Sequence, residues 1–205
     1  MKIMFLDTET GGKDPRKADI LQLSYQIIDD QMFNLVKQQN FYFRRERPAS
    51  SEAISVNGLT DEFLSKQDIT PRNIAIREFL IDLSGCCLLV AHCVDFDKAF
   101  VYYTCRRTHY TKRYTKVFDK LQTYDTMKET AGLCQLPFTA PRDYQHKSQY
   151  KYPRLSQLAD FLKVDRNDIN LHDSNSDVLL TVRCFAKLIK IGWVNLSLDA
   201  SETPP

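Results

Sequence analysis

The sequence lacks a long apolar run, and no stretch approaches the about 20 consecutive apolar residues that a membrane-spanning helix requires. The first apolar segment starts at Lys2 or Ile3, which leaves no room for a cleaved signal peptide. We therefore expect no membrane partner and, by default, a cytoplasmic location.

A strong net charge and a paired-cysteine motif are also absent. The formal net charge is only +2, which does not indicate a nucleic-acid coat protein. It leaves room for an enzyme that holds a few nucleotides with a local basic patch. The six cysteines include no Cys-x-x-Cys pair, and several lie in apolar runs. We interpret them as buried, reduced thiols rather than as a disulfide framework, and a zinc site built from them is the least favoured alternative.

Internal repeats and an evident domain linker are missing as well. With 205 residues, of which 43% are hydrophobic and 26% charged, the chain has the composition of an ordinary globular protein with a full core. We expect one domain over residues 1–195 and a disordered tail over residues 196–205. Residues 135–154 are poorly periodic and predict a long loop of the kind that is often functional or mobile.

Hydrophobic patterns predict an α/β fold with a mixed central sheet. Strands are expected at 2–7, 20–28, 33–43 and 86–91, and a strand followed by a helix is expected over 121–134. The short connection at 29–31 predicts that the second and third strands form an antiparallel hairpin. A helix is expected from Pro71 to Gly85, with Ile74, Phe79, Leu80 and Leu83 on its apolar stripe. Further helices are expected after the strand at 86–91, after Pro153 and over residues 174–190.

Three acidic segments carry the chemistry: residues 5–10, 91–97 and 172–177. Asp7 and Glu9 are two positions apart on a strand, so both carboxylates point to the same face. Asp97 falls at the start of a helix directly after a buried strand, where functional groups of α/β folds often lie. We prefer Asp97 to Asp95, which is expected to cap this helix.

His172 and Asp177 are five residues apart and would not share one face of a continuous helix. If Asp173 or Ser174 caps the helix, His172 lies in the preceding loop and can fold back toward Asp177. Four clustered carboxylates cannot all stay ionised unless divalent cations neutralise them. A histidine at the edge of such a site is placed to accept a proton from water.

Taken together, these segments resemble the motifs of the DnaQ-like (DEDDh) 3′–5′ exonucleases, a family that includes the proofreading subunit of bacterial DNA polymerase III. The run from Phe5 to Gly11 resembles the first motif, Ala91 to Asp97 the second, and His172 with Asp177 the third, in the family's order. Weaker likenesses lie at 57–60, 124–126 and 152–155. Two positions depart from the pattern: Cys93 replaces the usual asparagine, and Asn57 replaces the usual histidine.

The resemblance implies an RNase H-like fold with a five-stranded sheet, and a 3′–5′ exonuclease that releases nucleoside 5′-monophosphates. It implies two Mg²⁺ or Mn²⁺ ions held by Asp7, Glu9, Asp97 and Asp177, with His172 as the general base. It also implies substrate contacts from a wider set of residues: Thr8, Thr10, Asn57, Leu59, His92 and Phe96.

DNA is the favoured substrate, as a single strand or a 3′ end, with a role in proofreading or repair. A DNA polymerase catalytic subunit and a second copy of the chain are expected as candidate partners. Two alternatives stay open: an RNA 3′-end trimming enzyme, and a non-catalytic nucleic-acid-binding subunit with the same fold. Two basic segments with interleaved aromatic residues, 106–116 and 144–154, are either contacts for single strands or plain charged surface.

Overall fold

The computed structural model describes residues 1–138 and 148–196. Residues 139–147, which belong to the predicted loop and to the second basic segment, lie outside the described residues, as do residues 197–205 of the predicted tail. Within the described ranges, no helix is both long and apolar enough to cross a membrane.

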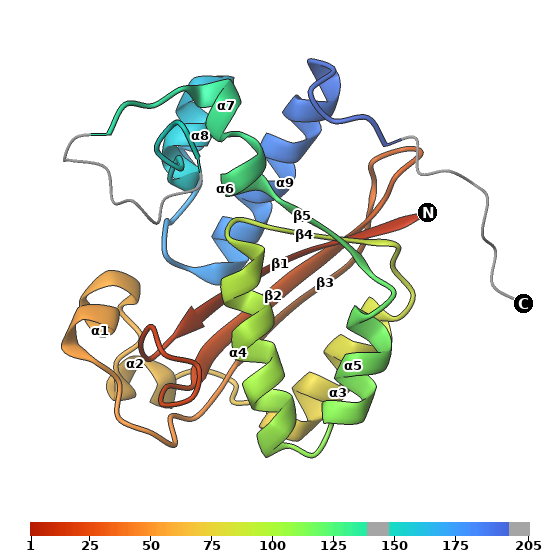
Figure 1. Cartoon of the computed structure of the whole chain (residues 1–205). Helices are drawn as coiled ribbons and strands as arrows, with labels where there is room; N and C mark the ends of the chain where they lie inside the picture. Colours follow the sequence, from red (N-terminus) through yellow and green to blue (C-terminus); the bar gives the residue numbers. More distant parts are fainter. Residues whose placement is uncertain (139–147, 197–205) are drawn as a thin grey trace, which may run out of the picture.

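Five strands form one mixed sheet, as predicted, and their order is β3-β2-β1-β4-β5 (Figure 1). Strands β1, β2 and β3 pair antiparallel, whereas β4 runs parallel to β1, and β5 runs parallel to β4. The strands are β1 (Lys2–Thr10), β2 (Ile20–Asp29), β3 (Leu35–Tyr42), β4 (Leu88–Ala91) and β5 (Gln122–Asp125). The antiparallel hairpin of β2 and β3 is confirmed, and β1 extends three residues beyond its predicted end.

Helices cover both faces of this sheet (Figure 1). Helices α3, α4 and α5 contribute to the core on one face, and α8 and α9 to the core on the other. The helices are α1 (Ser51–Asn57), α2 (Asp61–Ser65), α3 (Arg72–Leu83), α4 (Val94–Arg107), α5 (Thr111–Phe118), α6 (Thr126–Glu129), α7 (Ala131–Cys134), α8 (Leu155–Leu162) and α9 (Ser174–Lys190).

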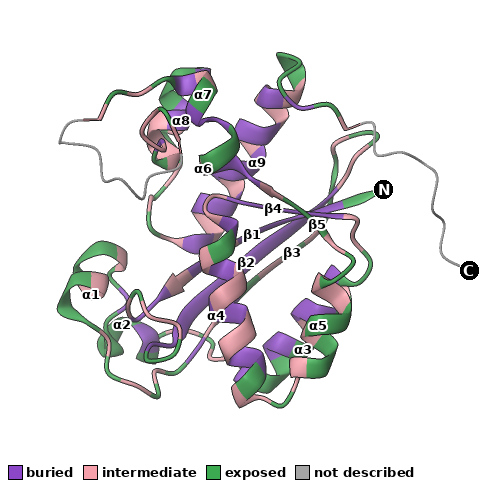
Figure 2. Cartoon of the chain, in the orientation of Figure 1, coloured by how far each residue is buried: buried purple, intermediate pink, exposed green. Residues whose placement is uncertain are grey.

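Alternation along β1 divides the core into these two layers, and it also sets the direction of the polar residues that follow. Met4 and Leu6 pack toward α3 and α4, whereas Ile3 and Phe5 pack toward α8 and α9. The central strands are buried while the outer faces of the helices are exposed (Figure 2). By the same alternation, the residues at 7 and 9 continue the α9 face, and the residue at 8 continues the α4 face.

Two expectations about the helices are wrong in detail. Ile74 is 53% exposed, because the buried stripe of α3 runs through Ala75, Ile76, Phe79, Leu80 and Leu83. Helices α1, α2 and α5 were not expected, since they are short and carry no fully apolar stripe. All six cysteines are free, as expected, although three of them are only partly buried.

The start of α4 differs from the expectation that Asp95 caps it. Cys93 occupies the N-cap position with a left-handed φ of 80°, and Asp95 instead pairs with Lys128. The carboxylate of Asp125, at the end of β5, accepts the backbone N–H groups of Cys93 and Val94 at 3.3 and 3.1 Å. A distant side chain therefore satisfies the first amide groups of α4, which makes a local cap unnecessary.

Candidate active site

The end of β1 delivers two carboxylates to the face that α9 covers. Asp7 and Glu9 both lie within the strand, opposite Ser24 and Gln22 of β2. Asp7 keeps one carboxylate oxygen, Oδ2, buried and without a hydrogen-bond partner among the described residues. An ionised oxygen in that state is unfavourable unless a cation or a proton accompanies it.

Asp97 reaches the site from the first turn of α4. Asp97 is 2% exposed, and its Oδ1 accepts a hydrogen bond from the hydroxyl of Thr8 at 2.7 Å. Thr8 itself is only 5% exposed, and it points toward α4 because it alternates with Asp7 along the strand. The hydrogen bond thus orients the carboxylate that was preferred over Asp95.

Asp177 and His172 approach from the start of α9, as the sequence predicted. Asp173 is the N-cap of the helix, and its Oδ2 accepts the backbone N–H of Ser176. His172 lies in the preceding loop with a left-handed φ of 67°, and its backbone N–H donates to Asp177 Oδ2 at 3.1 Å. The other oxygen, Asp177 Oδ1, is buried and has no hydrogen-bond partner in the described part of the chain.

Burial and mutual repulsion make these carboxyl groups unusually weak acids. The pKa of Asp7 is raised well above its usual value by burial first, and then by the charges of Asp97, Asp177 and Glu9. Burial is also the largest cause for the other three, and it raises the pKa of Glu9 to about 8, of Asp97 to about 7 and of Asp177 to about 6. Without a cation, the cluster therefore retains protons near neutral pH.

The donor set fits a divalent cation that prefers oxygen ligands. Ligand atoms of Glu9, His172 and Asp177 lie within 4.8 Å of one another. The two unpartnered oxygens, on Asp7 and Asp177, belong to the same cluster. Carboxylate oxygens dominate this set, which is the chemistry that Mg²⁺ and Mn²⁺ select.

A polar network behind the site, which the sequence did not reveal, fixes the start of α9 on the sheet. Gln22 of β2 donates to Asp173 Oδ1 at 2.5 Å and accepts the backbone N–H of Ser174 at 3.2 Å. The hydroxyl groups of Ser24 and Ser174 are 2.6 Å apart. Asp173 also raises the pKa values of Asp7, Glu9 and Asp177 through its charge, so a fifth carboxylate borders the cluster. In the sequence, the only sign of this network was the polar residues Gln22 and Ser24 on one face of the largely apolar β2.

Beside Glu9 lies a cleft with a volume of about 150 Å³. Of the predicted substrate contacts, Thr10, Asn57 and Phe96 line this cleft. Asn57 donates to the Thr10 carbonyl at 3.1 Å, and its side chain also lowers the pKa of Glu9 against the larger effect of burial. Phe96 packs on Phe100 with ring centroids 4.8 Å apart. This contact holds the Phe96 ring in place at the wall of the cleft.

The remaining predicted contacts do not line the cleft. Leu59 is 3% exposed and packs with Leu21 and Leu64 in a small separate cluster. His92 uses both ring nitrogens inside the protein, each at 3.0 Å, toward the Thr126 hydroxyl and the Pro153 carbonyl. Burial lowers the pKa of His92 to about 4, so its neutral ring ties β4 to the segment before α8. The role predicted for these residues in substrate binding stays a prediction.

Known proteins share this architecture. Escherichia coli exonuclease I in complex with a dT13 oligonucleotide superposes with a TM-score of 0.72 at 19% identity, over 92% of this chain and 41% of that one. The zinc-bound E. coli exonuclease I–single-stranded DNA complex gives 0.73 at 18% identity, over 93% and 40% of the two chains. Exonuclease I from Methylocaldum szegediense gives 0.70 at 18% identity, also over 93% and 40%.

These likenesses establish the fold, and the chain spans about two fifths of the length of the proteins it resembles. The mixed five-stranded sheet with its flanking helices is thus an RNase H-like fold, as the resemblance implied. A comparison with curated proteins found no significant match to the sequence. The RNase_T exonuclease family model matches residues 4–185, a span that contains all four carboxylates and the histidine. On that match, the chain belongs to the exonuclease family.

Proposed function

We propose that the protein is a divalent-metal-dependent 3′–5′ exonuclease that acts on single-stranded nucleic-acid ends, with DNA as the favoured substrate. The observation that carries the proposal is the convergence of four carboxylates from three elements, with two buried oxygens that lack partners among the described residues. Family membership supports the reaction class. Two neighbours of similar fold are E. coli exonuclease I bound to dT13 and to dA16 oligonucleotides.

Asp7, Glu9, Asp97 and Asp177 would hold the cations, for which Mg²⁺ or Mn²⁺ is the natural choice. When bound, two such ions activate the attacking water and stabilise the charge that develops on the phosphate. The hydroxyl of Thr8 keeps Asp97 oriented, and the His172 backbone N–H does the same for Asp177.

His172 is the general base in this proposal. Its side chain is exposed beside Glu9 and Asp177, so a ring nitrogen can accept the proton of the attacking water and pass it to solvent. The left-handed backbone places the ring in a loop rather than on the helix, where five-residue spacing would turn it away from Asp177.

The cleft beside Glu9 would receive the terminal nucleotide. Phe96 offers an aromatic face for stacking, and the Asn57 amide lies at the wall near Glu9. Association with a DNA polymerase catalytic subunit and formation of a homodimer are further proposals that rest on the family resemblance, and gel filtration with and without polymerase tests both.

The direct test is digestion of 5′-labelled single-stranded DNA, of duplex DNA and of RNA with Mg²⁺, Mn²⁺ or EDTA. We expect a ladder of strands shortened from the 3′ end, fastest on single-stranded DNA, and no cleavage in EDTA. The variant Thr115→Ala, on the outer surface of α5, serves as a control that removes no site residue. Cleavage that persists in EDTA, or products shortened from the 5′ end, would refute the proposal.

A further inference from the structure

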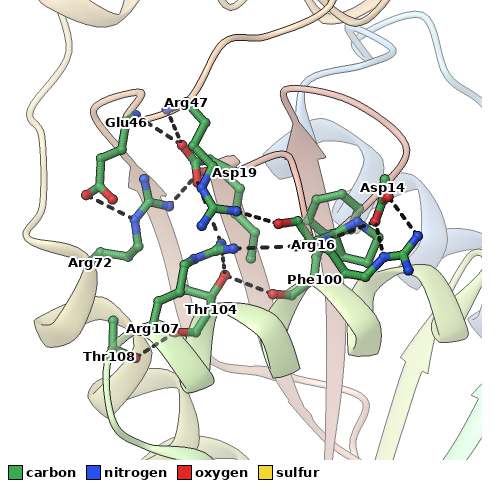
Figure 3. A network of polar contacts seen from close by, with 12 residues as sticks. Asp14, Arg16, Asp19, Glu46, Arg47, Arg72, Phe100, Thr104, Arg107 and Thr108 are labelled. Carbon is green, nitrogen blue, oxygen red and sulfur yellow. Dashed lines mark hydrogen bonds and ion pairs between the residues drawn. The ribbon is translucent and has the colours of Figure 1, made fainter.

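A cluster of arginines lies beyond the β1–β2 loop, outside the carboxylate site. Arg16, Arg47, Arg106 and Arg107, together with Tyr103, line a cavity of about 450 Å³. They come from three separate segments: the β1–β2 loop, the chain after β3 and the last turn of α4. Figure 3 shows the side chains of Arg47 and Arg107 gathered around the buried Asp19, with Arg16 beside Asp14.

Positive charge exceeds negative charge in this cluster. Arg47 and Arg107 share one carboxylate, that of Asp19, at 3.9 and 3.6 Å. Arg16 is paired with Asp14. Arg106 has no ion pair in the described ranges and lies over the Tyr103 ring at 5.5 Å.

Arg107 lies close to other positive charges, and this proximity affects its pKa. Its pKa is lowered by burial first and by the charge of Arg47 next. Its Nε is buried and has no hydrogen-bond partner among the described residues. An anion arriving in the cavity would relieve the repulsion between the two guanidinium groups and would gain charge-assisted hydrogen bonds.

A third hollow shares lining residues with both the arginine cavity and the cleft beside Glu9. Arg16 and Tyr103 also line this hollow of about 470 Å³, whose wall includes Lys13. Lys13 in turn lines the cleft that reaches Glu9 and Phe96. The three hollows thus adjoin one another through shared lining residues, and together they are called the groove, with Phe96 at one end and Tyr103 at the other. Two of its cations already have partners, since Lys13 pairs with Glu52 and Arg16 with Asp14.

We propose that this groove binds the phosphodiester backbone of the single strand whose 3′ end enters the carboxylate cluster. The inference rests on the proposed function and extends it to residues that would bind the nucleotides farther from the scissile bond. Rows of cations with interleaved aromatic rings suit single strands, because cations contact the phosphates and rings stack on the bases. The planar guanidinium group matches phosphate oxygens with two parallel hydrogen bonds.

A second basic surface provides a matched control. Lys112, Arg113, Lys116 and Lys120 line a larger cavity of about 640 Å³ on the α3–α5 side, which shares no lining residue with the groove. The predicted basic segment 106–116 is thus divided between the two surfaces. Lys112 and Lys116 are exposed, as are Arg16 and Arg106, so equal charge can be removed from either place with little risk to the fold.

The test compares Arg16→Gln/Arg106→Gln with Lys112→Gln/Lys116→Gln by fluorescence anisotropy of a labelled dT16 strand in EDTA. The groove variant should bind about tenfold more weakly, and its salt dependence should fall by about 1.4 in the slope of log K against log [salt], the value for two lost phosphate contacts to a single strand. The control variant should bind like the wild type. Circular dichroism melting of both variants checks that the fold is intact.

Equal binding by the two variants, or no binding of dT16 by the wild type, would overturn the inference. Displacement of the strand by inorganic phosphate as readily as by unlabelled dT16 would also overturn it, because it would indicate an isolated anion site. Hydrolysis with Mn²⁺ gives a second readout: the rise in KM of the groove variant should be several times larger on dT16 than on a dinucleotide. If the wild type hydrolyses neither substrate while the binding difference persists, the proposed function fails and the groove assignment stands.

Discussion

Two clusters of like charge lie at opposite ends of one groove, and they are stabilised differently. Around Asp19, the arginines share a buried carboxylate, and that carboxylate also accepts two backbone N–H groups. Asp19 Oδ1 accepts no hydrogen bond among the described residues, but two guanidinium groups face it. Around Asp7, the carboxylates face one another, and two of their oxygens have neither a hydrogen bond nor an ion pair in the described ranges. The positive cluster carries its own counter-ion, whereas the negative cluster requires one from solution. We infer that the second arrangement is maintained for binding cations.

The largest expected effect comes from Asp7→Asn, which keeps the shape of the side chain and removes its charge. Nuclease activity should fall by about three orders of magnitude or more, because cation binding and transition-state stabilisation are lost together. Rates of Mn²⁺-dependent digestion of dT16 measure the effect. Asp95→Asn, which removes an exposed carboxylate paired with Lys128, is the control and should retain most activity. A similar loss in both variants would contradict the assignment.

His172→Asn should slow hydrolysis by about a hundredfold, the usual contribution of a general base. Asparagine tolerates the left-handed backbone at this position, so the loop before α9 should keep its course. The pH–rate profile at saturating Mn²⁺, where the carboxylates hold the cation, distinguishes a base from a structural residue. Its acidic side should change in the variant, and an unchanged profile would show that His172 does not accept the proton.

Stability should respond in opposite directions when the two clusters lose a carboxylate. Asp19→Asn leaves Arg47 and Arg107 without their shared anion, and should cost about 2 kcal/mol, a discounted value because both arginines are partly exposed. Asp7→Asn removes repulsion, and in EDTA at pH 8 it should raise the melting temperature by a few degrees. Thermal melts in EDTA compare the melting temperature of each variant with that of the wild type. Destabilisation by both variants would mean that the carboxylate cluster is already neutralised.

The smallest effect is expected at the N-cap of α4, where Cys93 holds a left-handed φ of 80°. Cys93→Asn should raise the free energy of unfolding by about 0.5 kcal/mol, since asparagine adopts this conformation more readily than cysteine. Chemical denaturation measures the change, with Cys87→Ser as a control outside the left-handed region. A loss of stability would show that packing of the thiol outweighs the backbone preference.

The sequence was sufficient where local periodicity decides the outcome. Strand alternation places Asp7 and Glu9 on one face, and the N-cap at Asp173 leaves His172 in the loop beside Asp177, both as predicted. Contacts between segments that are distant in the chain could not be predicted from the sequence. Asp125 replaces the cap expected from Asp95, and Gln22 meets Asp173 across 151 positions of the chain. No periodic pattern in the sequence encodes such pairings.

Leu59 and the arginine cluster illustrate the same limit. The side chain of Leu59, between α1 and α2, packs with Leu64 of α2 and with Leu21 of β2, which is far from it in sequence. Arg16, Arg47 and Arg107 come together only after the sheet and α4 have packed. Composition revealed a net charge of only +2, whereas the fold gathers carboxylates around Asp7 and arginines around Asp19.

The most direct test of the account is calorimetric titration of the metal-free protein with Mn²⁺ near pH 7, in buffers of different ionisation enthalpy. The folded pKa values of about 8 for Glu9 and about 7 for Asp97 lie above those of free carboxyl groups. These groups are therefore partly protonated at pH 7, and binding must release protons. We predict saturable binding with buffer-dependent heat, lost in Asp7→Asn. No binding by the wild type, or equal binding by Asp7→Asn, would contradict the claim that the carboxylate cluster is a cation site.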